Sequence, residues 1–178
     1  MRLQQSTDFV SEEDYANYLK ETLIHEIEES TNELLQVIST VSNAMQIVEA
    51  NGVIAAQCKL SDRELQVCAM KIPAICAFLQ AKLSGLSMSS ALDDVMIDIQ
   101  MVRSLEQMPK DRSVGTATER AKKAELAVAE RRLENTGIKQ YIKAVQDLIT
   151  RADKVYEGVK KTLDYRAREL WFDQKPAN

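Results

Sequence analysis

Hydrophobic side chains recur along this chain every three or four residues, over stretches much longer than a single turn. In the first part of the chain they step by 4, 4, 7, 4, 3, 4 and 3 residues, through Leu19, Leu23, Ile27, Leu34, Ile38, Val41, Met45 and Val48. This spacing keeps one face of an α-helix apolar. We therefore expect a helix of about 39 residues, from Glu12 after the cap Ser11 to a left-handed stop at Asn51-Gly52.

The middle of the chain is expected to form shorter helices. Val53 to Leu60 is interpreted as an apolar connector, and the capping box Ser61 to Glu64, in which the two side chains satisfy each other's backbone amides, begins the next helix. Its apolar face contains Leu65, Cys68, Ile72, Ile75, Cys76, Leu79 and Leu83. Pro73 is expected to kink or split this helix, and Gly85 to end it.

A third helix is expected from the serine-rich residues 87–90 to about Gln107, so that the middle region forms a compact head of short helices. Residues 108–115 contain Pro109 and Gly115 and predict a loop. A second capping box, Thr116 to Glu119, then begins a helix that is expected to run to about Phe172.

This last helix carries the most regular pattern in the chain. Its apolar positions step by 3, 4, 3, 4, 3, 4, 4 and 3 residues, through Ile142, Val145, Ile149, Ala152, Tyr156, Val159, Leu163, Ala167 and Leu170. Such a repeat is typical of a coiled-coil seam. If unbroken, the helix is about 84 Å long against about 58 Å for the first helix, so one cannot cover the other completely. We therefore expect a homo-oligomer.

Composition agrees with this architecture. Five glycines and three prolines among 178 residues, with 5% aromatic residues, provide few turns for a β fold. The sequence therefore predicts an all-α protein with a long-helix coiled-coil or helical-bundle architecture and a short-helix head, within one structural domain.

Charge divides the chain into two regions. Residues 1–109 contain 7 Lys/Arg and 16 Asp/Glu, a net charge of −9, whereas residues 110–178 contain 16 and 11, a net charge of +5. This asymmetry favours either a nucleic-acid-binding segment in the basic region or attraction between the two regions of neighbouring subunits. The acidic region is expected to contact proteins.

Several classes of protein are not indicated by the sequence. Three cysteines without a Cys-x-x-Cys pair and a single histidine argue against a disulfide framework or a zinc site, so free core cysteines are expected. The N-terminal residues lack a signal-like apolar stretch, and the longest uncharged run has 15 residues. We therefore expect a cytoplasmic protein without a membrane segment. No common nucleotide-binding or hydrolase motif is present, and we expect neither a cofactor nor a metal.

A basic face is expected on the last helix. On a helical wheel its basic side chains fall between about 140° and 200° from Ala152, opposite the seam, and two aromatic residues share that face. Cations beside exposed rings are suited to single-stranded nucleic acid. The candidate nucleic-acid-binding residues are Arg132, Lys139, Lys143, Lys154, Lys161, Tyr165, Arg168 and Phe172. The alternative is a solvated charged face, and Asp147, Glu157 and Asp164 beside the stripe favour it.

One enzymatic pattern can also be drawn from the acidic residues. They are Glu26, Glu29 and Glu33 on the first helix and Asp94 and Asp98 on a later one. Carboxylates at turn spacing on two helices can hold Mg²⁺. The pattern resembles that of the all-α nucleotide pyrophosphohydrolases of the MazG type, although Ala91 stands where their second Glu-x-x-Asp motif begins. This is a remote alternative.

The last 60 residues resemble a known family. The segment Thr118-Glu-Arg-Ala-Lys-Lys-Ala-Glu-Leu126, followed by a long helix through Lys139-Gln-Tyr-Ile-Lys143 to Arg166-Ala-Arg-Glu-Leu-Trp-Phe172, resembles phage-type recombination-mediator proteins of the UvsY kind. The resemblance implies a helical oligomer that binds single-stranded DNA and helps to load a recombinase, in the host cytoplasm if the chain is encoded by a phage. The first 109 residues have no counterpart in it.

We therefore expect a non-enzymatic helical oligomer that binds single-stranded nucleic acid and assists recombination or replication. The alternative is a structural or adaptor protein, such as a phage assembly or anti-defence factor, whose long helices bind a protein partner.

Overall fold

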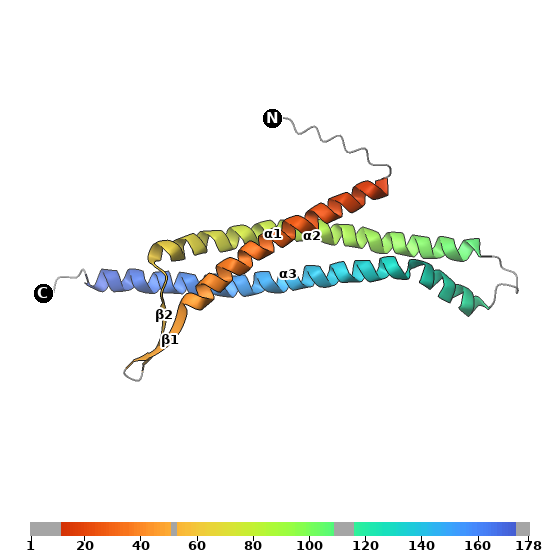
Figure 1. Cartoon of the computed structure of the whole chain (residues 1–178). Helices are drawn as coiled ribbons and strands as arrows, with labels where there is room; N and C mark the ends of the chain where they lie inside the picture. Colours follow the sequence, from red (N-terminus) through yellow and green to blue (C-terminus); the bar gives the residue numbers. More distant parts are fainter. Residues whose placement is uncertain (1–11, 51–52, 109–115, 174–178) are drawn as a thin grey trace, which may run out of the picture. The chain divides into compact units, whose positions relative to one another are not determined.

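The computed structural model describes residues 12–50, 53–108 and 116–173. Its elements are three long helices, α1 (Glu12–Ala44), α2 (Asp62–Gln107) and α3 (Ala117–Asp173), and two short strands, β1 (Met45–Ala50) and β2 (Val53–Cys58) (Figure 1). Helices contain most of the described residues. The predicted all-α fold built on long helices is therefore confirmed.

The chain divides into two compact units. Unit 1 consists of Met1–Ile24 and Leu83–Ala144, and unit 2 consists of His25–Lys82 and Val145–Asn178. Each of the three helices contributes residues to both units. Each unit thus combines residues from the acidic region with residues from the basic region, and the change of charge after Pro109 does not separate the units.

Both predicted capping boxes that lie within the described residues are present. The amide of Ser61 donates to Glu64 Oε2 (2.8 Å) and the amide of Glu64 to Ser61 Oγ (3.3 Å). The amide of Thr116 donates to Glu119 Oε2 (2.6 Å) and the amide of Glu119 to Thr116 Oγ1 (3.4 Å). Hydrogen bonds from the Ser61 hydroxyl and the Thr116 amide are the largest causes that lower the pKa of these two glutamates.

The expected short-helix head is replaced by one continuous helix. α2 passes through Pro73 and Gly85, so the predicted split at Pro73 and the predicted helix end at Gly85 are wrong. The buried side chains of α2 keep a spacing of three or four residues before and after both Pro73 and Gly85. They are Leu65, Cys68, Ile72, Cys76, Leu79, Leu83 and Leu86. Burial of this continuous face outweighs the cost of about 3 kcal/mol for proline and about 1 kcal/mol for glycine in a helix.

The first helix ends earlier than predicted. α1 stops at Ala44, and the segment expected to complete it forms β1, which pairs antiparallel with β2 from Met45 opposite Cys58 to Ala50 opposite Val53. The apolar side chains of Met45 and Val48 fit a helical repeat as well as a strand, and this ambiguity explains the wrong boundary. The Asn51-Gly52 pair, which lies outside the described residues, is also a strong two-residue hairpin signal.

The last helix agrees with the prediction. α3 runs from Ala117 through Gly137 and Gly158 to Asp173, one residue beyond the expected end at Phe172. α2 ends at Gln107, as expected before the predicted loop, and residues 109–115 of that loop lie outside the described part of the chain. The expected cap Ser11 also lies outside it, while α1 begins at Glu12 as predicted.

Unit 2 has an apolar core in which all three helices take part. Val41 of α1, Leu65 and Cys68 of α2, and Val159 of α3 form one buried cluster. Partly buried side chains surround it, among them Val37, Val155 and Leu163. Both ends of the hairpin contact the same cluster. Met45 at the start of β1, Cys58 at the end of β2 and Leu60 after it pack against the cluster.

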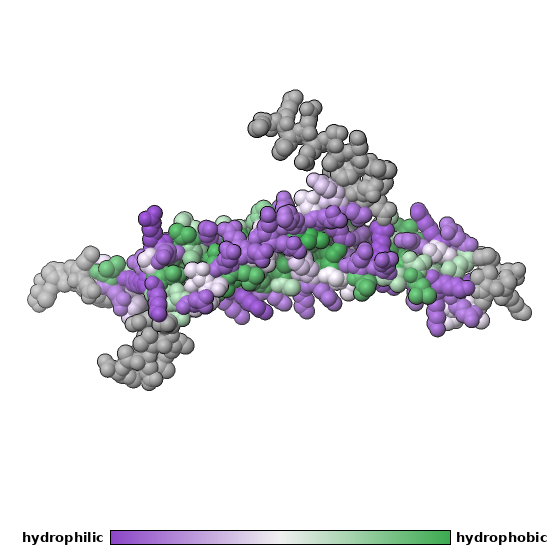
Figure 2. All heavy atoms as spheres, viewed as in Figure 1, coloured by the Kyte–Doolittle hydropathy of each residue, from purple (hydrophilic) through white to green (hydrophobic). Residues whose placement is uncertain are grey.

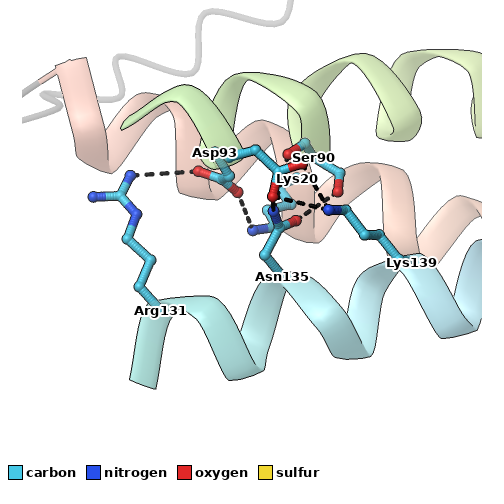
Figure 3. Close-up of polar contacts among 7 residues, drawn as sticks. Lys20, Ser90, Asp93, Arg131, Asn135 and Lys139 are labelled. Atoms are coloured by element: carbon cyan, nitrogen blue, oxygen red, sulfur yellow. Dashed lines mark hydrogen bonds and ion pairs between the residues drawn. The ribbon is translucent and has the colours of Figure 1, made fainter. Parts of the chain in front are cut away.

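Unit 1 contains a polar cluster at the contact of its helices (Figure 3). Asn135 of α3 and Ser90 of α2 are each only 2% exposed. The Ser90 hydroxyl donates to Asn135 Oδ1 (2.5 Å), and Asn135 Nδ2 donates to the Ser90 carbonyl (3.0 Å) and to Asp94 Oδ1 (2.8 Å). Next to them, Asp93 forms ion pairs with Lys20 of α1 (2.8 Å) and Arg131 of α3 (3.3 Å). The serine expected to cap a helix is therefore part of a buried contact between two helices.

The cysteines are free, as predicted. Cys68 and Cys76 are buried on the apolar face of α2, and Cys58 at the end of β2 is half-buried. Burial is the largest cause that raises the pKa of the Cys68 and Cys76 thiols. Both thiols are therefore kept protonated near neutral pH and behave as small hydrophobic side chains.

One described helix, α2, is long and apolar enough to cross a membrane by length and composition. Its most apolar window has a mean hydropathy of 1.3, and 28% of that window is buried. A core helix of a soluble protein passes the same test, so this is weak evidence for a membrane segment. The exposed part of this apolar surface is considered below.

Candidate nucleic-acid interface

The buried residues of α3 show which face of this helix contacts the rest of the protein, and so which of its basic side chains point away from that contact. The seam predicted from Ile142 to Leu163 is buried or half-buried, and the same alternation of three and four residues continues back to Ala124. In heptad notation its members occupy the a and d positions, with Ala152 at d. Beyond Leu163 the prediction is wrong, because Ala167 and Leu170 are exposed.

Three of the candidate cations point directly away from the seam. Lys154, Lys161 and Arg168 occupy successive f positions, seven residues apart, in unit 2. All three are exposed, and none of them makes an ion pair within the described residues. Successive f positions are about 10 Å apart along the helix. This set therefore agrees with the predicted basic face.

Two exposed aromatic residues of α3 lie close in sequence to these cations. Tyr165, at a c position, is 63% exposed, and a hydrogen bond with Glu169 raises the pKa of its hydroxyl. Trp171, at the next b position, is 60% exposed and was not among the predicted residues. The heptad assignment by itself places Trp171 on the outer side. The side chain of Phe172 lies outside the described ones.

Two of the predicted cations are engaged elsewhere. Lys139 Nζ is 2.6 Å and 2.8 Å from the two carboxylate oxygens of Asp94 (Figure 3). Arg132 Nη2 is 3.9 Å from Asp98 Oδ1 and donates to Met101 Sδ. Both partners belong to α2, so the expectation that these two cations face away from the helix contact is wrong.

The repeat of the seam explains this difference. A wheel at 100° per residue assumes a straight helix, whereas a sustained 3.5-residue repeat moves the buried face by about 20° per heptad. Arg132 lies nearly three heptads before Ala152, which gives a displacement of about 60°. Arg132 and Lys139 therefore occupy e positions beside the seam, within reach of acids on α2. Lys143, at a b position of unit 1, is exposed.

Positive and negative charges on α3 are equal in number in unit 2. Between residues 145 and 173, α3 carries six Lys/Arg and six Asp/Glu. Lys160 forms an ion pair with Glu157 (3.5 Å) and lies 5.3 Å from the centre of the Tyr156 ring. Binding of an anion at this face would therefore depend on local contacts with the outward cations, not on long-range attraction.

Arg166 has a structural role that the sequence did not indicate. It occupies a d position, where an apolar residue is expected, and is followed by the exposed end of α3. Its guanidinium donates to the carbonyls of Cys58 (2.5 Å) and Leu60 (2.8 Å) and to Asp62 Oδ1 (2.7 Å). It thereby fixes the segment between β2 and α2 to α3 within unit 2. This cation is not available to a ligand.

The acidic residues of the enzymatic alternative contact Lys, Arg or His side chains instead of one another. In unit 2, Glu26 contacts Lys82 (2.6 Å), Glu33 contacts Lys71 (3.0 Å) and Glu29 contacts His25 (3.5 Å). In unit 1, Asp94 and Asp98 contact Lys139 and Arg132. Among the described residues, no group of three or more His, Cys, Asp or Glu side chains could hold a metal ion. The magnesium site of that alternative is therefore not formed in this part of the chain.

Comparison with other proteins does not assign a family. No protein-family model, curated protein or solved structure matches this chain.

Proposed function

We propose that this protein is a non-enzymatic helical accessory protein that binds single-stranded nucleic acid along the outer face of α3 in unit 2. One observation carries the proposal. Lys154, Lys161 and Arg168 are exposed at successive f positions without an ion pair, beside the exposed ring of Tyr165. Cations of this kind neutralise phosphates, and an exposed ring can stack on an unpaired base.

The resemblance of the C-terminal region to recombination mediators supports the same assignment. It also suggests the biological setting of the proposal: a homo-oligomer that acts in recombination or replication, with a recombinase as a second protein partner, in the cytoplasm of the cell or of a phage host. Three phosphate contacts are few. The expected slope of log affinity against log salt concentration is therefore only about −2 for a single strand.

The test is a titration of labelled oligo-dT with the protein at two salt concentrations. At about 50 mM salt the parent is expected to bind, and Lys154→Glu/Lys161→Glu is expected to lower the affinity by at least about tenfold, since two phosphate contacts are lost and two repulsions are added. The matched control is Lys122→Glu/Lys123→Glu, which changes the net charge equally at exposed positions of unit 1. Equal losses in both variants would show that only net charge matters, and would contradict the proposal.

A second variant separates stacking from charge. Tyr165→Ala is expected to weaken binding by about 1 to 3 kcal/mol if a base stacks on the ring, with an unchanged salt slope, because stacking releases no counterions. The exposed ring makes no contribution to the buried cluster of unit 2. The helical content should therefore stay the same.

The second candidate function is that of an adaptor that binds a protein through its long helices. The observation that favours it is a row of exposed apolar side chains on α2, described in the next subsection. Absence of oligo-dT binding by the parent at about 50 mM salt would favour this function, because phosphate contacts are strongest at low salt.

A further inference from the structure

The part of α2 that belongs to unit 1 has apolar residues on two faces. One face is buried and contains Leu86 and Ile97 together with the polar Ser90. On the opposite side, at steps of 4, 3, 4 and 3 residues, lie Met88, Leu92, Val95, Ile99 and Val102, which we call the α2 stripe. Its members are between 40% and 68% exposed. Figure 2 shows hydrophobic residues, in green, reaching the surface near the end of α2 and the start of α3, both in unit 1.

The spacing of the α2 stripe is that of a coiled-coil seam without its partner helix. Single exposed apolar residues are normal on protein surfaces, but a contiguous row marks an interaction site. Between Met88 and Val102 the stripe contains five consecutive seam positions, over about 21 Å of helix. Leu92 and Ile99 take the a positions, and Met88, Val95 and Val102 take the d positions.

We propose that the α2 stripe is covered by the α2 stripes of further copies of this chain, in a parallel coiled coil. The inference rests on the part of the proposed function that makes the protein a homo-oligomer, and it identifies the surface and the orientation of that assembly. It does not depend on nucleic-acid binding.

Charge complementarity selects the chain itself as the partner. Asp98 lies at a g position beside the stripe, and Arg103 lies at the e position of the following heptad. In a parallel, in-register coil, a g residue meets the e residue five positions later on the neighbouring helix. Asp98 of one copy therefore meets Arg103 of the next. An antiparallel arrangement brings g next to g and e next to e, and gives no pair of opposite charge.

Both charged groups are accessible for this contact. The side chain of Asp98 is 76% exposed and its contact with Arg132 is long, at 3.9 Å. Arg103 is exposed and makes no ion pair within the described residues. The valines at two d positions favour three or four strands over two, because β-branched residues at d pack poorly in parallel dimers. The expected mass is therefore three or four times 20.1 kDa.

Light scattering after size-exclusion chromatography tests the surface. The parent is expected to be an oligomer, and Leu92→Gln/Val95→Gln/Ile99→Gln is expected to return a single chain of 20.1 kDa with unchanged helical circular dichroism. The control Leu126→Gln/Leu133→Gln removes two leucines that are each 74% exposed on α3 of the same unit, and should leave the oligomer intact.

The outcomes separate this inference from the proposed function. An oligomeric parent whose mass is unchanged by the stripe variant overturns the inference and leaves the proposed oligomer standing, whereas a monomeric parent overturns both. If the parent is monomeric and sediments with lipid vesicles through the α2 stripe, the partner of the stripe is a membrane. If it is monomeric and does not sediment with vesicles, the remaining candidate partner is another protein.

A charge exchange tests the orientation. Asp98→Arg and Arg103→Asp should each weaken association by about tenfold, because each places like charges beside the seam, and the double exchange should restore it. If the effect of Asp98→Arg arose from repulsion of Arg132 within the same chain, Arg103→Asp would not restore association. Failure of the double exchange to restore the parent mass distribution would contradict the parallel arrangement.

Discussion

The two units use the same three helices but differ in what lies at the centre of the helix contact. In unit 2 the contact is apolar, with Val41, Leu65, Cys68 and Val159 in one cluster. In unit 1 the seam of α3 contains Asn135, which is buried and hydrogen-bonded to Ser90 and Asp94 (Figure 3). One coiled-coil repeat on α3 therefore serves two kinds of contact.

This difference separates stability from specificity. An apolar seam gains free energy from burial and tolerates a shift of one heptad, because the shifted contacts are also apolar. A buried amide at an a position is satisfied only when its own partners are opposite, so it determines the register at some cost in stability. We expect unit 2 to contribute most of the stability and unit 1 to determine how α2 and α3 are aligned within it.

The largest expected effect is in the apolar cluster of unit 2. Leu65→Ala leaves a cavity at a fully buried side chain and is expected to lower the free energy of unfolding by about 2 to 5 kcal/mol. Urea denaturation measures the loss, and amide hydrogen exchange should locate it mainly in unit 2. Equal acceleration of exchange in both units would indicate that they unfold together and would weaken the comparison.

A smaller effect is expected at the polar cluster of unit 1. Asn135→Ala leaves the buried Ser90 hydroxyl without its acceptor and is expected to cost about 1 to 3 kcal/mol in urea denaturation. The double variant Asn135→Leu/Ser90→Ala replaces both partners by apolar groups. It is expected to recover most of that stability, because no buried polar partner is left unsatisfied.

The same double variant also tests the role in register. If Asn135 determines the alignment, NMR spectra of the double variant should show additional or broadened signals from unit 1, although the protein is stable. A single sharp set of signals would show that the flanking ion pairs of Asp93 determine the register instead.

The helix caps give a pH-dependent effect of intermediate size. Hydrogen bonds lower the pKa of Glu64 in unit 2 and Glu119 in unit 1 below their values in the unfolded chain. Stability from these groups is therefore present above the unfolded pKa and is lost as the pH falls through the folded pKa. Ser61→Ala is expected to cost about 1 kcal/mol near neutral pH.

This prediction is tested by comparing the pH profiles of the parent and a variant that lacks both capping hydroxyls. Thermal unfolding from neutral to acidic pH should show a smaller acid-dependent loss in Ser61→Ala/Thr116→Ala than in the parent, since each carboxyl loses the hydroxyl donor that helps to lower its pKa and keeps only the backbone amide donor. Parallel profiles of the two proteins would show that the hydroxyl hydrogen bonds of the caps do not contribute to the pH dependence.

The smallest expected effect compares glycines on α3. Gly137 of unit 1 has open space where a Cβ would lie, and at Gly158 of unit 2 a Cβ would meet only Met45 Cε at 4.0 Å. Gly137→Ala and Gly158→Ala are therefore each expected to raise the free energy of unfolding by about 0.5 to 1 kcal/mol. Urea denaturation of both variants provides the comparison. A loss of stability at Gly158 would show that the contact with β1 is tighter than these distances indicate.

Local signals in the sequence were sufficient for most helix boundaries. The two capping boxes and the apolar repeat of α3 predicted Asp62, Ala117 and the end near Phe172 because capping and helix periodicity act within a few residues. The end of α1 was not predicted. Met45 to Cys58 can continue a helix or form a hairpin, and the described structure has the hairpin packed beside Arg166 and the apolar cluster of unit 2.

The candidate interface was predicted in part. The f-position residues Lys154, Lys161 and Arg168 could be identified because they lie close to the seam residues that defined the wheel. Arg132 and Lys139 were misplaced because the angular drift of the seam adds up over several heptads. Trp171 could have been found from the heptad assignment, whereas Arg166 at a seam position gave no signal of its contacts with the chain before α2.

The sequence alone determined that this protein consists of long α-helices with two definite caps and a coiled-coil repeat, since these features depend on short-range spacing. The tertiary structure decided which polar groups are used within the protein. Asp94 forms an ion pair with Lys139, and Asn135 forms hydrogen bonds with Ser90. Arg166 donates hydrogen bonds to the carbonyls of Cys58 and Leu60. These pairs are between 45 and 108 residues apart in the chain, so only the packing of the helices brings their charges and dipoles within hydrogen-bonding distance.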